Sequence, residues 1–87
     1  MSHVKESILY FPCDYLVKIE GKNTREFEST ILKIVERHTG KLDRHQVVSK
    51  SKGRATSLTI RIVAANRAQI NNLNHDLSNC PLVTFIL

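Results

Sequence analysis

Strict alternation of apolar and polar residues marks one short segment of the chain, Leu58-Thr59-Ile60-Arg61-Ile62. A period of two is typical of a β-strand that buries one face against a core. The segment Tyr15–Glu20 alternates in the same way and is followed by Gly21. Both segments therefore predict half-buried strands, the earlier of which is expected to stop at the glycine.

Two helices are expected between the strands, because apolar residues recur there at spacings of three and four. The first helix begins at Asn23, which forms a capping-box-like pair with Glu26, and it ends at Gly40. The second helix begins at Asn66, a residue that caps helices well. The residues expected on the buried faces are Phe27, Ile31, Ile34, Val35 and His38 in the first helix and Ile70, Leu73 and Leu77 in the second.

Two weaker strands complete the pattern. One covers Leu42–Lys50 and leads into a turn at Ser51–Arg54, and the other covers Leu82–Leu87 after Pro81. The resulting order, β-α-β-β-α-β with right-handed crossovers, predicts an α+β fold, the ferredoxin-like plait. In this fold a four-stranded antiparallel sheet has two helices on one face, and we expect the first and third strands at its centre.

A chain of 87 residues and 9.9 kDa is long enough for one domain, so residues 1–87 are expected to form a single unit. Residues 1–13 are a lead-in, whose apolar part Ile8–Phe11 is expected to pack across the domain. The expected core consists of Tyr15, Val17, Ile19, Phe27, Ile31, Val35, Val47, Leu58, Ile60, Ile62, Ile70, Leu73, Leu77, Val83 and Phe85.

Composition excludes several classes of protein. No apolar run is long enough to span a membrane, and the N-terminus lacks the apolar stretch of a signal peptide. The two cysteines, Cys13 and Cys80, are too few for a disulfide scaffold and are expected to be free thiols in the cytoplasm. They and the four histidines show no metal-ligand spacing, so no metal and no cofactor is expected.

Positive charge is concentrated in residues 41–54, which hold five basic residues and one acid, whereas the whole chain carries +5. Such a segment can attract phosphate, nucleic acid or an acidic partner, or it can simply keep an exposed hairpin soluble. A phosphate-binding P-loop is excluded, because Ser49–Gly53 joins two strands and lacks the required glycine spacing. Base stacking on the sheet is disfavoured, because no aromatic residue is expected on its open face.

The chain resembles the YbeD-like family of small uncharacterised bacterial proteins over nearly its whole length. The residues that carry the resemblance are Phe11-Pro12, Lys18-Ile19-Glu20-Gly21, Val35-Glu36-Arg37-His38, Ser51-Lys52-Gly53, the strand from Ser57 to Ile60, Gln69, Leu73 and the closing Val83-Thr84-Phe85-Ile86-Leu87. The resemblance implies a ferredoxin-like fold similar to the small-molecule-binding regulatory domains of the ACT type. It implies no enzymatic activity and no catalytic residues. Ala65-Asn66 departs from the threonine expected at the start of the second helix.

The sequence therefore predicts a cytoplasmic regulatory or interaction module that binds a small ligand or a protein partner without catalysis and can form a homodimer. The alternative is a nucleic-acid or phosphate-binding module that uses the basic hairpin 41–54; a membrane partner is not expected. The candidate contacts for a ligand, anion or partner are Lys18, Arg37, His38, Lys50, Lys52, Gly53, Arg54 and Arg61. The candidate interface on the open sheet face is Leu16, Val48, Leu82, Thr84 and Ile86.

Overall fold

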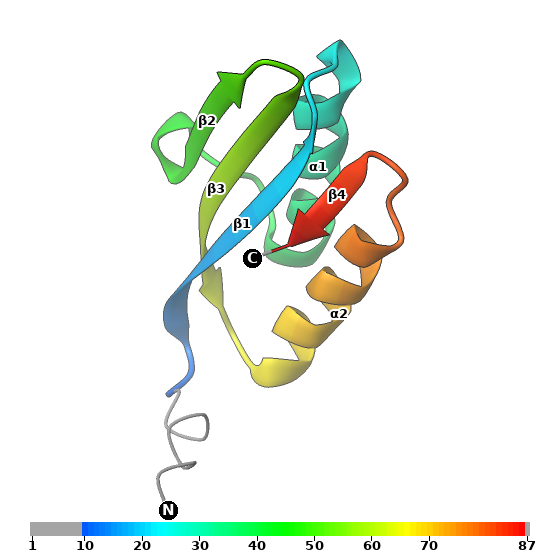
Figure 1. Ribbon diagram of the computed structural model, residues 1–87. Helices are drawn as coiled ribbons and strands as arrows, with labels where there is room; N and C mark the ends of the chain where they lie inside the picture. The colour runs from blue at the N-terminus through cyan, green and yellow to red at the C-terminus, as the bar shows by residue number, and fades with distance from the viewer. Residues whose placement is uncertain (1–9, 87) are drawn as a thin grey trace, which may run out of the picture.

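The computed structural model describes residues 10–86 and has the expected order of elements (Figure 1). These elements are β1 (Cys13–Lys22), α1 (Arg25–Thr39), the 3₁₀ turn η2 (Arg44–Gln46), β2 (Val47–Lys52), β3 (Ala55–Ala64), α2 (Arg67–Ser78) and β4 (Val83–Ile86). The sheet has the order β2-β3-β1-β4, every neighbouring pair is antiparallel, and both helices cover the same face. The ferredoxin-like plait is confirmed.

The two strands with the clearest alternation, β1 and β3, lie side by side at the centre of the sheet. Both are longer than expected, and they pair continuously from Cys13 opposite Ala64 to Lys22 opposite Ala55. Gly21 does not end β1 but lies inside it. A Cβ atom at this position would overlap the Phe27 ring and the Leu82 carbonyl oxygen, so a residue without a side chain is needed here. The glycine therefore allows α1 and the segment before β4 to pack closely on the strand.

The core lies between the sheet and the two helices, as expected. Its buried apolar residues are Val17, Ile19, Phe27, Ile31, Ile34, Val35, Leu58, Ile60, Ile62, Leu73, Leu77 and Cys80, with Ile70 and Ala64 also buried. Tyr15, Val47 and Val83 are partly buried and pack against this cluster. Gly40 ends α1 with a positive φ of 88°, and Asn66 caps α2 by accepting a hydrogen bond from the Gln69 N–H at 2.9 Å.

The position of Phe85 corrects the sequence prediction, which placed this residue in the core. Phe85 lies opposite Glu20, on the face away from the helices, and its exposed fraction is 45%. A register shift between Glu20 and Gly21 adds a residue to β4, so the expected alternation is offset by one position. The same shift overturns the outward orientation expected for Ile86, which packs against the core instead. Leu82 was also expected to point outward but packs against the core, because it lies in the turn before β4 and not in the strand.

The start of α1 is the second correction. The N-cap is Thr24, not Asn23, and it makes no side-chain capping hydrogen bond. Asn23 instead binds the β2–β3 turn: its backbone N–H donates to the Arg54 carbonyl at 2.8 Å and its side-chain amide to the Gly53 carbonyl at 3.2 Å.

The remaining differences concern the two segments that precede β1 and β2. The strand expected from Leu42 begins only at Val47, because residues 44–46 form η2. In the lead-in, Ile8 and Leu9 lie outside the described residues, and the Tyr10 side chain is 80% exposed, so Tyr10 does not pack on the domain as expected.

Candidate functional site: the open face of the sheet

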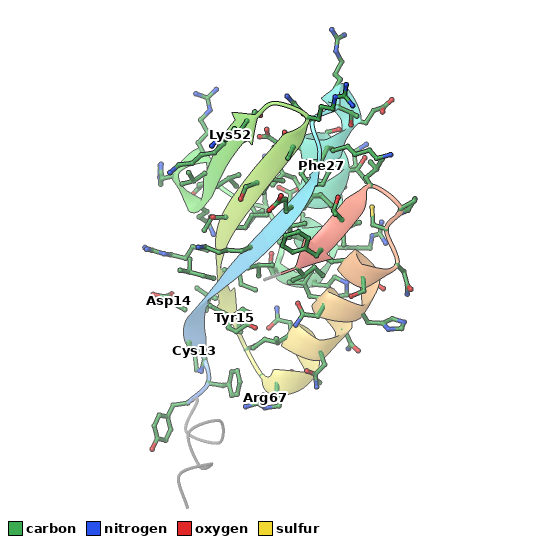
Figure 2. All side chains as sticks on the ribbon, viewed as in Figure 1. Cys13, Asp14, Tyr15, Phe27, Lys52 and Arg67 are labelled. Atoms are coloured by element: carbon green, nitrogen blue, oxygen red, sulfur yellow. The ribbon has the colours of Figure 1, made fainter. Side chains whose placement is uncertain are left out.

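The sheet face opposite the helices, called here the open face, carries most of the exposed apolar surface. Because side chains alternate along a strand, even-numbered residues of β1 and β2 and odd-numbered residues of β3 project from it. Figure 2 shows this alternation in β1, where Asp14 and Tyr15 project to opposite sides. The large apolar side chains on this face are Leu16, 53% exposed, Val48, 50%, Val63, 58%, and Phe85, 45%. They share one face of the sheet and alternate there with polar and charged side chains, since Leu16 lies opposite Arg61 and Phe85 opposite Glu20. Exposed apolar residues that share a face make it a candidate binding surface.

Positive charge accompanies these apolar residues on the open face. Its cations are Lys18, Lys22, Lys50, Lys52 and Arg61, against the two carboxylates Asp14 and Glu20. Within residues 10–86, none of these side chains forms an ion pair. The cations are therefore available to a negatively charged partner.

Cross-strand register explains how the lysines come together. Thr59 of β3 lies between Lys18 of β1 and Val48 of β2, and Ser57 lies between Glu20 and Lys50. The small side chains of β3 leave a hollow of about 360 Å³ lined by Lys18, Val48, Lys50, Ser57 and Thr59. A second hollow of about 280 Å³ adjoins it toward the hairpin and is lined by Glu20, Lys50, Lys52, Ala55 and Ser57.

The basic hairpin ends the open face at a tight turn. Lys52 pairs with Ala55, and Gly53 and Arg54 between them form a two-residue loop in which Gly53 has a φ of 63°. A positive φ at the first loop position only is what a type II′ turn requires. Lys52 projects at the hairpin end of the sheet (Figure 2), and the two hydrogen bonds from Asn23 anchor the turn to the β1–α1 connection.

Arg37 and His38 lie apart from the other predicted contact residues, in the helix layer. His38 Nε2 is 2.6 Å from Asp76 Oδ2 of α2, so this imidazole already has a carboxylate partner. Arg37 is exposed and lines a hollow between the helices with Lys33 and Asp76. An anion site at Arg37 and His38 stays a prediction, and it would be separate from the open face.

The predicted contacts thus divide among three places. Lys18, Lys50, Lys52 and Arg61 share the open face, Gly53 and Arg54 form its hairpin end, and Arg37 and His38 lie across the core. Of the predicted interface, Leu16 and Val48 are exposed on the open face and Thr84 is exposed in the irregular part of β4. Lys22, Val63 and Phe85 were missed. Continued alternation in β3 could have revealed Val63, whereas nothing local to the sequence reveals the shift that exposes Phe85.

The cysteines, the possible metal ligands and the hydropathy of the helices are the other features of residues 10–86 that bear on function. Cys13 is partly buried and Cys80 is buried, and both are free thiols. From Tyr10 to Ile86, no three His, Cys, Asp or Glu side chains gather closely enough to hold a metal ion. In the same stretch, neither helix has the length and hydropathy of a membrane span.

The fold and this face define a small ferredoxin-like protein with a basic, partly apolar open sheet surface. Residues 6–87 match the family described as "Protein of unknown function (DUF493)", and the chain belongs to this family. Similar relatives are bacterial proteins described as "UPF0250 protein". One from Vesicomyosocius okutanii is 46% identical over 100% of this chain and 97% of its own. One from Ruthia magnifica is 43% identical over 94% and 91%. One from Neisseria gonorrhoeae is 31% identical over 95% and 93%. The resemblance to a family of small uncharacterised bacterial proteins is confirmed.

Proposed function

We propose that this protein is a non-catalytic interaction module of the ACT-like regulatory kind, whose open face binds an acidic protein partner in the cytoplasm. The observation that carries the proposal is the coincidence of exposed Leu16, Val48, Val63 and Phe85 with five cations on one sheet face. The resemblance to the YbeD-like family, which implies no enzymatic activity, supports a non-catalytic role. The free thiols of Cys13 and Cys80 support a reducing compartment.

The distribution of the apolar residues favours a protein over a small molecule. They come from all four strands, so a ligand that contacts them together must extend across the whole sheet. Apolar side chains surrounded by charged ones are also the usual composition of a protein–protein interface. The hollows at Lys18 and Lys50 accommodate single side chains of such a partner.

The charge of the face favours an acidic partner over a second copy of this chain. Pairing two open faces would bring two positively charged surfaces together, and like charges juxtaposed in an interface cost several kcal/mol. An acidic partner gains from the same lysines, both in encounter rate and in orientation.

Site-specific crosslinking tests the proposal. A photoreactive amino acid is introduced at Leu16 on the open face and, as a matched control, at Asn72, an exposed position on α2. We expect an adduct with another protein from position 16, reduced by high salt, and none from position 72. Equal adducts from both positions, or a homodimer adduct from position 16, would contradict an acidic partner on the open face.

Single-stranded nucleic acid is the second candidate, and the exposed position of Phe85 favours it. Aromatic rings on an open sheet face stack with bases in ferredoxin-like RNA-binding modules. Phe85, however, lies on an edge strand opposite the Glu20 carboxylate, which repels phosphate. The salt dependence of RNA binding separates the two candidates, because phosphate contacts weaken steeply with salt.

A further inference from the structure

The outer edge of β2 adjoins a groove against α1, and we propose that this edge accepts an extended segment of a partner protein as an additional strand. The segment would alternate acidic and apolar side chains. This inference goes beyond the proposed function, because it uses the backbone of β2 and the groove behind it, and it shares only Lys50 and Lys52 with the open face.

The backbone of β2 is available along its outer edge. β2 is the first strand in the order β2-β3-β1-β4, so it pairs with β3 on one side only. Lys52 and Ala55 flank the two-residue loop and form a hydrogen-bonded pair, and such pairs alternate along an antiparallel ladder. The backbone groups of Val48, Lys50 and Lys52 therefore face β3. Those of Val47, Ser49 and Ser51 face outward. The Val47 N–H already donates to the Arg44 carbonyl oxygen of η2, whereas within residues 10–86 the backbone groups of Ser49 and Ser51 have no backbone partner on that side.

One further contact supports this phase of the ladder. The Gln46 side-chain amide donates to the Arg61 carbonyl oxygen at 2.9 Å. If β2 extended one residue further toward its N-terminus, this carbonyl would accept the next hydrogen bond of the β2–β3 ladder. Arg61 is two residues beyond Thr59, the partner of Val48, so the Arg61 carbonyl points toward β2 as the alternation requires.

A groove of about 310 Å³ runs between this edge and α1. It is lined by Glu28, Leu32 and Glu36 of α1, by Leu42, Asp43 and Arg44 of the connection, and by Val47 and Ser49 of β2. Leu32, Leu42 and Val47 are partly buried and pack on the core, so they form an apolar floor. When a peptide adds a strand to a sheet edge, main-chain hydrogen bonds provide affinity and pockets for alternate side chains provide specificity. The apolar floor would receive every second side chain of the segment.

The other side chains of the segment would face the opposite way, beside Lys50 and Lys52. Both lysines are exposed on the open face and unpaired among the described residues. Opposite charges directly across neighbouring strands stabilise a sheet, and like charges destabilise it. Acidic side chains at these positions are therefore favoured. A second copy of β2 would bring its own lysines to this edge, and edge lysines are a known means of preventing self-pairing.

A peptide titration followed by NMR tests the inference on the full chain. The probe is a peptide of about ten residues that alternates glutamate and valine, and the control peptide has the same composition in two blocks, one of each residue. We expect the alternating peptide to shift the amide signals of Ser49, Ser51 and Leu32, and the block peptide to bind at least about tenfold more weakly.

Variants of β2 identify the mode of binding. Ser49→Pro removes an outward N–H, a change that an edge strand tolerates because no ladder hydrogen bond is lost. We expect it to weaken binding at least about tenfold, whereas the matched Ser49→Ala keeps the N–H and binds like the wild type. If Ser49→Pro does not fold, Leu32→Gln provides the same test from the groove side. Replacing Lys50 and Lys52 by Glu should reverse the preference: this variant should bind a peptide that alternates lysine and valine more tightly than the peptide that alternates glutamate and valine.

Three results would overturn the inference. The alternating peptide could fail to bind at millimolar concentration, or it could bind with full affinity to Ser49→Pro. The free protein could also self-associate through β2, with Ser49→Pro restoring the monomer in sedimentation. None of these results bears on crosslinking from Leu16, so failure here is distinguishable from failure of the proposed function.

Discussion

His38 Nε2 lies 2.6 Å from Asp76 Oδ2, and this pair joins the last turn of α1 to the last turn of α2. A second polar link adjoins it, because the Gln69 side-chain amide donates to the His38 backbone carbonyl at 2.7 Å. The two helices are therefore connected at the edge of the core by side chains that are distant in sequence.

Breaking the His38–Asp76 pair should destabilise the domain modestly. A hydrogen bond that involves a carboxylate contributes up to about 1.5–3 kcal/mol, and partial exposure of both side chains reduces this to about 1 kcal/mol. We expect a coupling free energy of about that size in a double-mutant cycle of His38→Gln and Asp76→Asn, measured by urea denaturation. Asn72→Ala, an exposed change on the same helix, should have little effect. A coupling energy of zero would show that the pair is structurally incidental.

Gly21→Ala should destabilise the domain much more. The added methyl group would overlap the Phe27 ring and the backbone oxygen of Leu82, so the strand and the segment before β4 must separate. Overpacking of this kind costs about 1–3 kcal/mol, and the involvement of backbone favours the upper end. Chemical denaturation measures the effect, with the neighbouring exposed Lys22→Ala as control. Equal stability of the two variants would exclude the close packing at Gly21.

Ile60→Asp should abolish folding, whereas Thr59→Asp should not. Ile60 is completely buried in a central strand, and an unpaired charge there costs several kcal/mol against a total stability of about 5–15 kcal/mol. Thr59 is the next residue and lies on the open face opposite Lys18, where a carboxylate is solvated and near a cation. Thermal melts followed by circular dichroism compare the two. A cooperative melt for Ile60→Asp with loss of folding for Thr59→Asp would mean that β3 is shifted by one residue.

The local spacing of apolar and polar residues was sufficient to predict the two central strands and the two helices. Ile60 alternates with polar neighbours, and Leu73 lies on a helical apolar face, so their burial follows from the residues beside them. Strand order followed from connectivity, because two right-handed crossovers leave few arrangements of the sheet.

Contacts between distant segments could not be predicted in this way. The exposure of Phe85 depends on a register shift opposite Glu20, and nothing in the short strand itself indicates it. Asn23 was expected to cap α1 but binds the turn at Gly53. In each case the partner is decided by tertiary packing, which one sequence read locally does not contain. For the same reason the candidate site was found only in part: Lys18, Lys50 and Lys52 were recognised, whereas Lys22 and Phe85 were not.

The basic hairpin provides the test that separates an acidic protein partner from nucleic acid. We expect the wild-type protein to bind single-stranded RNA only weakly, with no sub-micromolar affinity at moderate salt. Phe85 is the aromatic residue on the open face of the described strands, and Glu20 lies beside it. Stacking of one base contributes only about 1–3 kcal/mol, so most of the affinity would have to come from phosphate contacts, which salt weakens steeply.

Fluorescence anisotropy at low and moderate salt measures this directly, using the wild type and a variant with Lys50, Lys52 and Arg54 all replaced by Ser. Weak wild-type binding that vanishes at moderate salt is the expected result, because the cations of the hairpin then act only as a diffuse charge. A nucleic-acid-binding module would behave differently: its affinity would survive moderate salt, and the triple variant would flatten the salt dependence by up to about three units, roughly one for each lost phosphate contact. Lys33→Ser is the control, because Lys33 is an exposed cation of α1 in the helix layer, on the other side of the core. Sub-micromolar binding that the hairpin variant abolishes and Lys33→Ser preserves would replace the protein-partner proposal with the nucleic-acid one.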